Sequence, residues 1–212
     1  MLRKESIDTK VLDLLHSLED KEYLKDFLLV GGTGLALMIG HRLSIYIDLF
    51  TTKDFDAENL LEKLESDFDF NMDFIGKNTL KGDADGVKVD FIAHKYPLIN
   101  KTLEIENIRI ASIDDISAMK ANSVANDGTR VKDFIDLFSL ISEHEYSVEK
   151  LLKNYGAKYK QRNAMHALKS LNYFEDVNIT DWPELLKKKE ISWKVVKNRI
   201  NKACKDYIRT IP

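Results

Sequence analysis

Two aspartates lie in segments whose neighbours are mostly apolar. Asp48 lies near the end of the alternating segment 44–50, and Asp90 lies inside the apolar run 87–92. A carboxylate in such surroundings is usually hydrogen-bonded, ion-paired or bound to a metal ion. Two carboxylates on neighbouring strands would hold a hard cation such as Mg²⁺, which takes one or two protein carboxylates together with substrate phosphates. Asp48 and Asp90 are therefore candidate metal ligands.

A simpler interpretation of the same two residues also stands. Asp48 could cap a turn with Thr51 and Thr52, and Asp90 could pair with Lys88 or with an arginine. Neither arrangement needs a metal ion.

The segment Gly31-Gly32-Thr33 interrupts an apolar run and precedes a short helical pattern. Glycines allow a close approach to the backbone, and the free N–H groups at a helix N-terminus bind phosphate well. The three residues are candidate phosphate-binding residues. The alternative is an ordinary tight turn from a strand into a helix.

A third group of candidates lies in the second half of the chain. Asp133 and Asp136 are three residues apart, so a helix places them on one face, and Lys120 belongs to the preceding helix. A lysine and an arginine near a phosphate turn could neutralise a triphosphate, which makes Lys120 and Arg42 candidates. Alternatively, these residues form a surface ion-pair ladder between the two helices, and Arg42 pairs with Asp133 or Asp136 to tie the halves together.

The elements that must position these residues change in type along the chain. The first half predicts helices at 8–22, with Asp8 as N-cap, at 35–40 and at 56–67, and strands at 27–30, 44–50, 71–75, 79–83 and 86–93, followed by a strand pair within 103–110. Residues 81–86 supply a turn between two of these strands, and Glu106-Asn107 supplies another.

The second half predicts helices only, at 114–125, 130–142, 147–158, 161–172 and 183–202. Trp182 and Trp193 are expected to anchor helix packing. The fold class is therefore α/β (α+β): a small mixed-sheet domain over residues 1–110 and an all-helical domain over 111–212. We expect a cleft between them.

Composition excludes several other classes of protein. The 212 residues are 44% apolar and 32% charged, which is typical of a globular chain and excludes disorder and collagen. One cysteine excludes a disulfide framework and a cysteine-rich metal centre, so we expect a reducing compartment, the cytoplasm. No apolar run approaches the roughly 20 residues of a membrane helix.

Charge is unevenly distributed. Residues 145–212 carry 15 Lys+Arg and 8 Asp+Glu, whereas residues 1–144 carry 17 and 27. The basic part could dock a polyanion, or it could be a set of solvated helix faces. Within it, aromatic and basic residues alternate in a way that weakly favours RNA, namely Tyr155, Lys158, Tyr159, Lys160 and Arg162.

Three blocks of this sequence together resemble the AbiEii/AbiGii toxin family of bacterial nucleotidyltransferases, within the polymerase-β-like superfamily. The blocks are the glycine segment with the run through Asp48 (30–50), the run around Asp90 (87–92), and Lys120 with the pattern Arg-Val-Lys-Asp-Phe-Ile-Asp-Leu (130–137). The first and third blocks are the more specific.

The resemblance implies a mixed-sheet nucleotidyltransferase domain and a helical domain. It implies that the glycine turn binds an NTP, and that an Asp-x-Asp pair and a third carboxylate hold Mg²⁺. The activity would be transfer of a nucleoside monophosphate to an acceptor hydroxyl, on tRNA or on protein, with a separate antitoxin as partner. Lys120 would contact the triphosphate, Asp133 or Asp136 would act as base or orient Arg42, and Ser44 would lie in the nucleotide site.

The sequence departs from the family pattern at one ligand. The Asp-x-Asp pair reads Tyr46-Ile47-Asp48, and a neutral phenol is a poor ligand for Mg²⁺. Asp48 and Asp90 could still hold one ion, and the Tyr46 ring is expected to point into the cleft beside Asp48. Three interpretations remain open: an active transferase, a catalytically silent member that binds nucleotide, RNA or an antitoxin, and a purely structural interaction protein that uses the basic helical domain.

Overall fold

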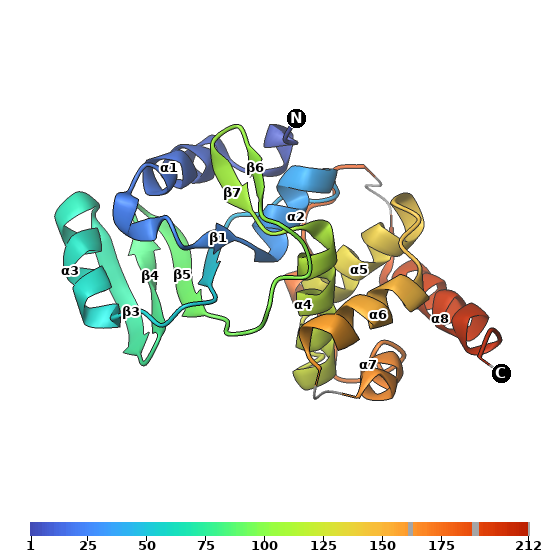
Figure 1. The fold of residues 1–212 in the computed structure, drawn as a ribbon. Coiled ribbons are helices and arrows are strands. Elements are labelled where there is room, and N and C mark those ends of the chain that lie inside the picture. The colour runs from blue at the N-terminus through green and yellow to red at the C-terminus, as the bar shows by residue number, and fades with distance from the viewer. Residues whose placement is uncertain (161–162, 188–190, 212) are drawn as a thin grey trace. The chain divides into compact units, whose positions relative to one another are not determined.

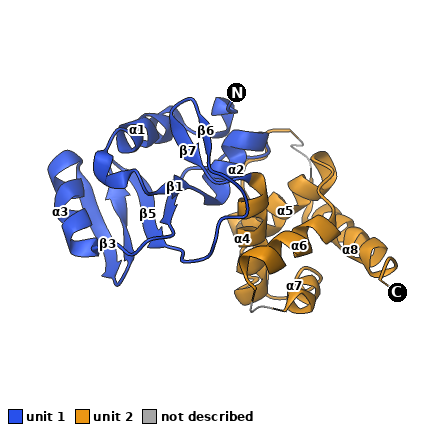
Figure 2. Cartoon of the chain, in the orientation of Figure 1, with its two compact units in different colours: residues 1–112 blue, residues 113–212 orange. Residues whose placement is uncertain are grey.

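The computed structural model describes residues 1–160, 163–187 and 191–211, in two compact units. Unit 1 is Met1–Ser112 and unit 2 is Ile113–Pro212, so the division falls two residues beyond the predicted boundary (Figure 2). Unit 1 contains all the strands in the described residues, and the helices of unit 2 follow one another without a sheet (Figure 1). The mixed α/β half and the all-helical half expected from the sequence are both present.

Unit 1 holds one seven-stranded mixed sheet. Its strands are β1 (Leu28–Leu29), β2 (Ile47–Thr51), β3 (Phe70–Gly76), β4 (Thr79–Ala84), β5 (Val87–Ala93), β6 (Leu103–Ile105) and β7 (Ile108–Ile110), in the spatial order β3-β4-β5-β2-β1-β7-β6. β2 runs parallel to β5, and β1 runs parallel to β7 and antiparallel to β2. The central strands β2 and β5 are therefore neighbours although β3 and β4 separate them in the sequence.

Two-residue turns fix the register of two hairpins. Asp85 and Gly86 both have positive φ and join β4 to β5, and Glu106 and Asn107 do the same between β6 and β7. Positive φ at both central residues is the requirement of the tight hairpin turns that suit twisted strands. The Glu106-Asn107 turn lies where the sequence predicts it, whereas the other occupies only the last two residues of the predicted segment 81–86.

Three α-helices and two short 3₁₀ helices complete unit 1. They are α1 (Thr9–Glu19), α2 (Gly31–Ile39) and α3 (Ala57–Asp67), with the 3₁₀ helices at Lys4–Ser6 and Glu22–Leu24. Asp8 caps α1 as predicted, accepting the Lys10 N–H at 2.8 Å. The stripes Val11, Leu14, Leu15 and Leu18 of α1 and Leu60 and Leu64 of α3 are buried. One face of the sheet is apolar and buried, with Ile47, Leu49, Leu80, Val89 and Phe91.

Unit 2 consists of helices around a buried apolar core. They are α4 (Ile113–Asn126), α5 (Val131–Glu143), α6 (Val148–Lys158), α7 (Ala164–Ser170) and α8 (Trp193–Ile208), with a 3₁₀ helix at Ile179–Asp181. The prediction of a helix over 183–202 is wrong at its start. Trp182 is extended, as residues before proline prefer, and α8 begins only at Trp193. Residues 161–162 and 188–190, which belong to two predicted helices, lie outside the described residues.

The late start of α8 has a packing reason. The Trp182 and Trp193 rings are 6.5 Å apart, and Trp193 also packs against Phe134 and Phe174 at 5.7 and 5.6 Å. An extended segment brings Trp182 to this cluster, which confirms the two tryptophans as packing anchors. Among the described helices, none is long and apolar enough to cross a membrane.

Candidate functional site

Asp48, Asp90 and Lys81 form a row across three adjacent strands of unit 1. Asp48 on β2 is the direct partner of Asp90 on β5, and Asp90 is the direct partner of Lys81 on β4. Direct partners point to the same face of a sheet. This face is opposite the apolar one, because Leu49 and Phe91 alternate with the aspartates and are buried. The two predicted ligands thus lie side by side.

Asp90 is ion-paired in the structure. The Lys81 Nζ lies 2.6 Å from Asp90 Oδ2, whereas Lys88 pairs with Asp73 at 2.5 Å. The expectation that Asp90 would pair with Lys88 or an arginine is therefore wrong in its partner. The register of the β4–β5 hairpin decides this, since it places Lys81 opposite Asp90 and Lys88 opposite Asp83.

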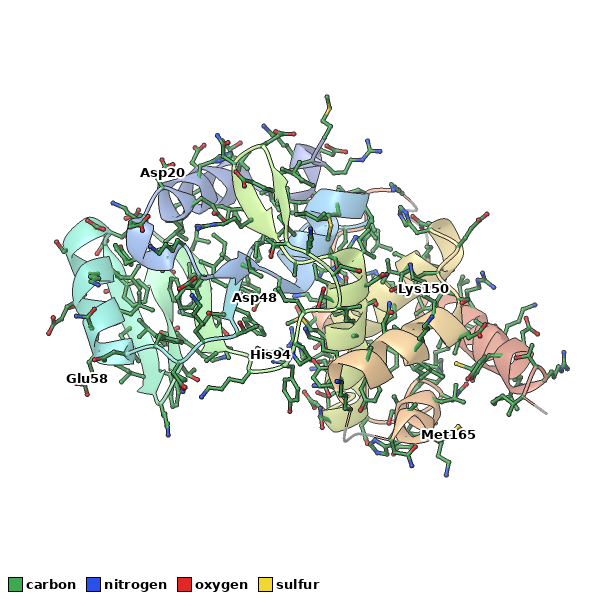
Figure 3. All side chains as sticks on the ribbon, in the orientation of Figure 1. Asp20, Asp48, Glu58, His94, Lys150 and Met165 are labelled. Carbon is green, nitrogen blue, oxygen red and sulfur yellow. The ribbon has the colours of Figure 1, made fainter. Side chains whose placement is uncertain are left out.

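Helix α2 begins at Gly31, earlier than predicted, and its first residues meet two charged side chains. A Cβ on Gly31 would lie 2.0 Å from Asp48 Oδ2, and a Cβ on Gly32 would lie 2.1 Å from Arg42 Nη2. Gly31 also has φ +65°, which favours glycine. The glycine pair therefore lets a carboxylate and a guanidinium reach the helix N-terminus (Figure 3 labels Asp48).

The first N–H groups of α2 have no bond within the helix. Its N-cap, Val30, has no polar side chain, and the Val30 N–H itself donates to the Asp48 carbonyl at 2.9 Å. The first helical bond in α2 is from the Gly34 N–H to the Val30 carbonyl, so the earlier N–H groups of the first turn have no partner within the helix. A helix end of this kind suits an anion such as a phosphate.

Thr33 and Ser44 connect α2 to the segment before β2. Their hydroxyl oxygens are 2.9 Å apart, and the Thr33 hydroxyl also donates to the Tyr46 carbonyl. Both side chains are buried, and the Ser44 N–H donates to the Ser6 carbonyl at 2.8 Å. These bonds occupy residues 44–46, which explains why β2 starts at Ile47 rather than at the predicted residue 44.

Tyr46 precedes β2 and is 49% exposed. The hydrogen bond to Asp73 is the main cause of a raised Lys88 pKa, and the Tyr46 phenol adds a smaller electrostatic contribution. Tyr46 therefore lies near Lys88, which is two residues before Asp90 on β5. Tyr46 lies two residues before Asp48, just outside β2.

The carboxylates fit one hard cation better than a multi-metal centre. Among the described residues, no three His, Cys, Asp or Glu side chains gather closely enough to hold a metal ion. Asp48 and Asp90 offer two oxygen ligands on one face, which suits Mg²⁺ when substrate phosphates complete its shell.

In unit 2, Lys120 on α4 holds both aspartates of α5. Its Nζ lies 2.6 Å from Asp133 Oδ1 and 2.7 Å from Asp136 Oδ2, and all three side chains are buried. The Ser123 hydroxyl donates to Asp133 at 2.6 Å. The predicted residues are thus brought together, but as a buried cluster, so the surface ion-pair ladder is wrong.

Burial and neighbouring charges act in opposite directions on Asp133. Burial raises its pKa, but Lys120 and Arg130 outweigh burial and the nearby Asp136, so the pKa lies below its ordinary value. The fold therefore favours the ionised carboxylate. A second buried pair joins Lys158 to Asp115 at 2.9 Å.

Two features were misjudged from the sequence. Lys81 was missed, although the Asp85-Gly86 turn pairs residue 84 with 87 and hence 81 with 90. The predicted strand 79–83 contains Lys81, but the broad turn predicted over 81–86 leaves the register between the two strands undefined, and the register is what pairs Lys81 with Asp90. The pattern at 155–162 does not form one exposed surface: Tyr155, Lys158 and Tyr159 are buried, and Arg162 lies outside the described residues.

Comparison with known proteins decides the family. Residues 13–194 match the family described as nucleotidyl transferase AbiEii toxin, Type IV TA system. The chain belongs to the AbiEii family. An uncharacterized Aquifex aeolicus protein, aq_aa25, is 33% identical over 187 residues, which cover 86% of this chain and 88% of that protein.

The fold of this AbiEii chain is also found in a solved structure. A candidate nucleotidyltransferase from H. pylori superposes with a TM-score of 0.58 at 18% identity, over 96% of this chain and 97% of the other. That likeness supports the nucleotidyltransferase fold. The α/β class and the family predicted from the sequence are both confirmed.

Proposed function

We propose that this AbiEii chain transfers a nucleoside monophosphate from an NTP to an acceptor hydroxyl, on tRNA or on protein. One observation carries the proposal: Asp48 and Asp90 lie at the same register on parallel neighbouring strands, and the Asp48 carboxylate touches the N-terminus of α2. Oxygen ligands for a cation thus adjoin donors for a phosphate, which is the combination that an NTP needs.

The reaction forms one bond and breaks one. The acceptor oxygen bonds to the α-phosphorus, the bond from that phosphorus to the bridging oxygen breaks, and pyrophosphate leaves with the electron pair. The hydroxyl proton passes to a water molecule, because Asp133 and Asp136 are buried and held by Lys120 within unit 2. Mg²⁺, held by Asp48 and Asp90, would neutralise charge on the phosphates.

The other residues are proposed to bind the nucleotide. The amides of Gly31, Gly32 and Thr33 would receive the phosphates. Arg42 lies against Gly32, where its guanidinium can neutralise phosphate charge, and Ser44 holds Thr33 in place. Lys120 instead holds Asp133 and Asp136 together within unit 2.

Tyr46 favours a second candidate function. With a tyrosine two residues before Asp48 and no group of three possible metal ligands among the described residues, the chain could bind nucleotide, RNA or an antitoxin without transfer. Both candidate functions predict nucleotide binding, but only the transferase predicts a labelled product. An assay for labelled product therefore separates them.

The first prediction concerns labelling. Purified protein is incubated with Mg²⁺, total tRNA and each α-labelled NTP in turn. We expect the wild type to label an acceptor weakly and Tyr46→Asp to label it at least about tenfold faster, because the aspartate restores a ligand for the cation. Asp48→Asn should abolish labelling in both backgrounds.

The matched control is Asp73→Asn. It removes a carboxylate from strand β3, which is adjacent to neither β2 nor β5, so labelling should persist. Nucleotide binding by calorimetry without labelling in wild type and Tyr46→Asp would support the silent alternative. Expression of Tyr46→Asp should also slow growth more than the wild type does, and co-expression of a cognate antitoxin should relieve it.

A further inference from the structure

The Lys81–Asp90 pair occupies part of the proposed cation site. Both residues are in the middle of regular strands, and the β4–β5 register makes them direct partners. The Lys81 side chain is 40% exposed and that of Asp90 30%, and the ammonium lies 2.6 Å from Asp90 Oδ2. A cation at Asp90 therefore meets a positive charge already bound to one oxygen.

Formal charges show what Lys81 changes. Asp48 and Asp90 alone carry two negative charges, and Lys81 leaves the row with one. A single divalent cation then turns the net charge to plus one, which suits an incoming polyphosphate. A second divalent cation would bring it to plus three, with only two carboxylates to hold both ions.

We propose that Lys81 is a built-in counter-cation of Asp90, which limits the site to a single divalent ion. The inference rests on the proposed function, since it takes Asp48 and Asp90 as the ligands. Lys81 acts through Asp90 and is therefore a positioning residue. The Lys81 ammonium group, which is part of the protein, occupies the position that a second metal ion would otherwise take.

A neighbouring lysine provides the contrast. Lys88 is also on this sheet face and pairs with Asp73 at 2.5 Å, with both side chains about half exposed. Asp73 is on β3, away from Asp48 and Asp90 in the strand order. Removing the Lys88 charge therefore changes a somewhat more exposed pair without releasing a proposed ligand.

Manganese titration followed by electron paramagnetic resonance tests the proposal, because Mn²⁺ accepts the same oxygen ligands and bound ions can be counted. We expect one ion per wild-type chain. Lys81→Gln should bind Mn²⁺ about fivefold more tightly or take up a second ion, because Asp90 is released from an exposed pair of ordinary strength. Lys81→Arg should behave as the wild type, and so should Lys88→Gln.

Each other outcome is decisive. Wild-type affinity and stoichiometry in a folded Lys81→Gln, or two ions in the wild type, would overturn the role of Lys81 while leaving the site intact. Mn²⁺ binding that survives Asp48→Asn, or no binding in any variant, would instead refute the proposed metal site. If Lys81→Gln does not fold, Lys81→Met serves, with thermal melting as the check.

Discussion

Gly31 and Gly32 each adjoin one charged side chain, and this explains why both are glycine. The Asp48 carboxylate and the Arg42 guanidinium occupy the space that two Cβ atoms would need. The sequence predicts a glycine turn open to a phosphate. The structure adds that the missing Cβ atoms leave room for the protein's own Asp48 and Arg42 side chains. The glycine turn therefore also positions Asp48, the proposed ligand.

At this scale we predict that Gly31→Ala displaces Asp48. The substitution should cost at least about 1–2 kcal/mol of unfolding free energy, because φ is +65° and a Cβ would lie 2.0 Å from Asp48 Oδ2. Mn²⁺ affinity should fall with it. Urea unfolding and Mn²⁺ titration measure the two effects.

The control is Gly156→Ala on α6, where an added Cβ has nothing within 4 Å. There the change should stabilise by about 0.5–1 kcal/mol, since alanine favours helix over glycine. If Gly31→Ala matched Gly156→Ala in stability and metal binding, the close approach of Asp48 to α2 would be refuted.

Among the elements, the buried cluster between α4 and α5 makes unit 2 sensitive to acid. The Asp133 pKa is lowered in the fold, so the unfolded chain binds a proton more readily there. The contribution of Asp133 to the unfolding free energy is fully present above the pKa of the unfolded chain, about 3.9. It is lost as the pH falls through the lower pKa of the folded state.

We therefore predict that the stability difference between wild type and Asp133→Asn is largest above about pH 5 and narrows below about pH 4. Urea unfolding between pH 3 and 7 measures it. Glu149→Gln, at an exposed position on α6, is the comparison variant. Its unfolding free energy should change with pH in the same way as that of the wild type. A difference for Asp133→Asn that stays constant with pH would contradict the account.

Local signals predict the elements well and the contacts between them less well. Asp8 and the Glu106-Asn107 turn act within a few residues, so the sequence alone places them. The neighbouring positions of Asp48 and Asp90 followed from the strand pattern and the family resemblance. The sequence also groups Lys120, Asp133 and Asp136 correctly. Their burial depends on how α4 and α5 pack together, which the spacing of residues in the sequence does not reveal.

The elements that failed depend on distant partners. β2 is shortened because Ser6 and Thr33 bind residues 44–46, and α8 starts late because Trp182 joins an aromatic cluster. Ser6 and Thr33 are distant from β2 in the sequence, and the cluster that Trp182 joins at Trp193 includes the distant Phe134. Periodicity therefore overestimated both elements, each at its N-terminal end.

For the whole molecule, the uneven charge is concentrated most on α8. Its sixteen residues carry five basic side chains and one acidic one, while Val196, Ile200 and Cys204 form its buried stripe. If tRNA is the acceptor, the exposed side of α8 is a place for its phosphates. The charge asymmetry of the sequence would then serve to bind the acceptor.

We predict that replacing Lys194, Lys197 and Lys205 with Gln weakens tRNA binding at low salt. The slope of log affinity against log salt should become shallower by roughly one for each lysine that contacts a phosphate. Fluorescence anisotropy at several salt concentrations measures this. Replacing Lys53, Lys63 and Lys77 in unit 1 removes the same charge and should leave the slope unchanged; equal effects would indicate nonspecific attraction.

The parallel pairing of β2 with β5 also determines when the site can exist. Asp48 and Asp90 are 42 residues apart, and α3, β3 and β4 lie between them in the chain. Hairpins between neighbouring strands close short loops, whereas this pairing must close a long one and is slower to form. A growing polypeptide therefore cannot pair Asp48 with Asp90 until β5 has been synthesised. Any fragment that ends before β5 lacks the paired carboxylates, so topology delays assembly of the site.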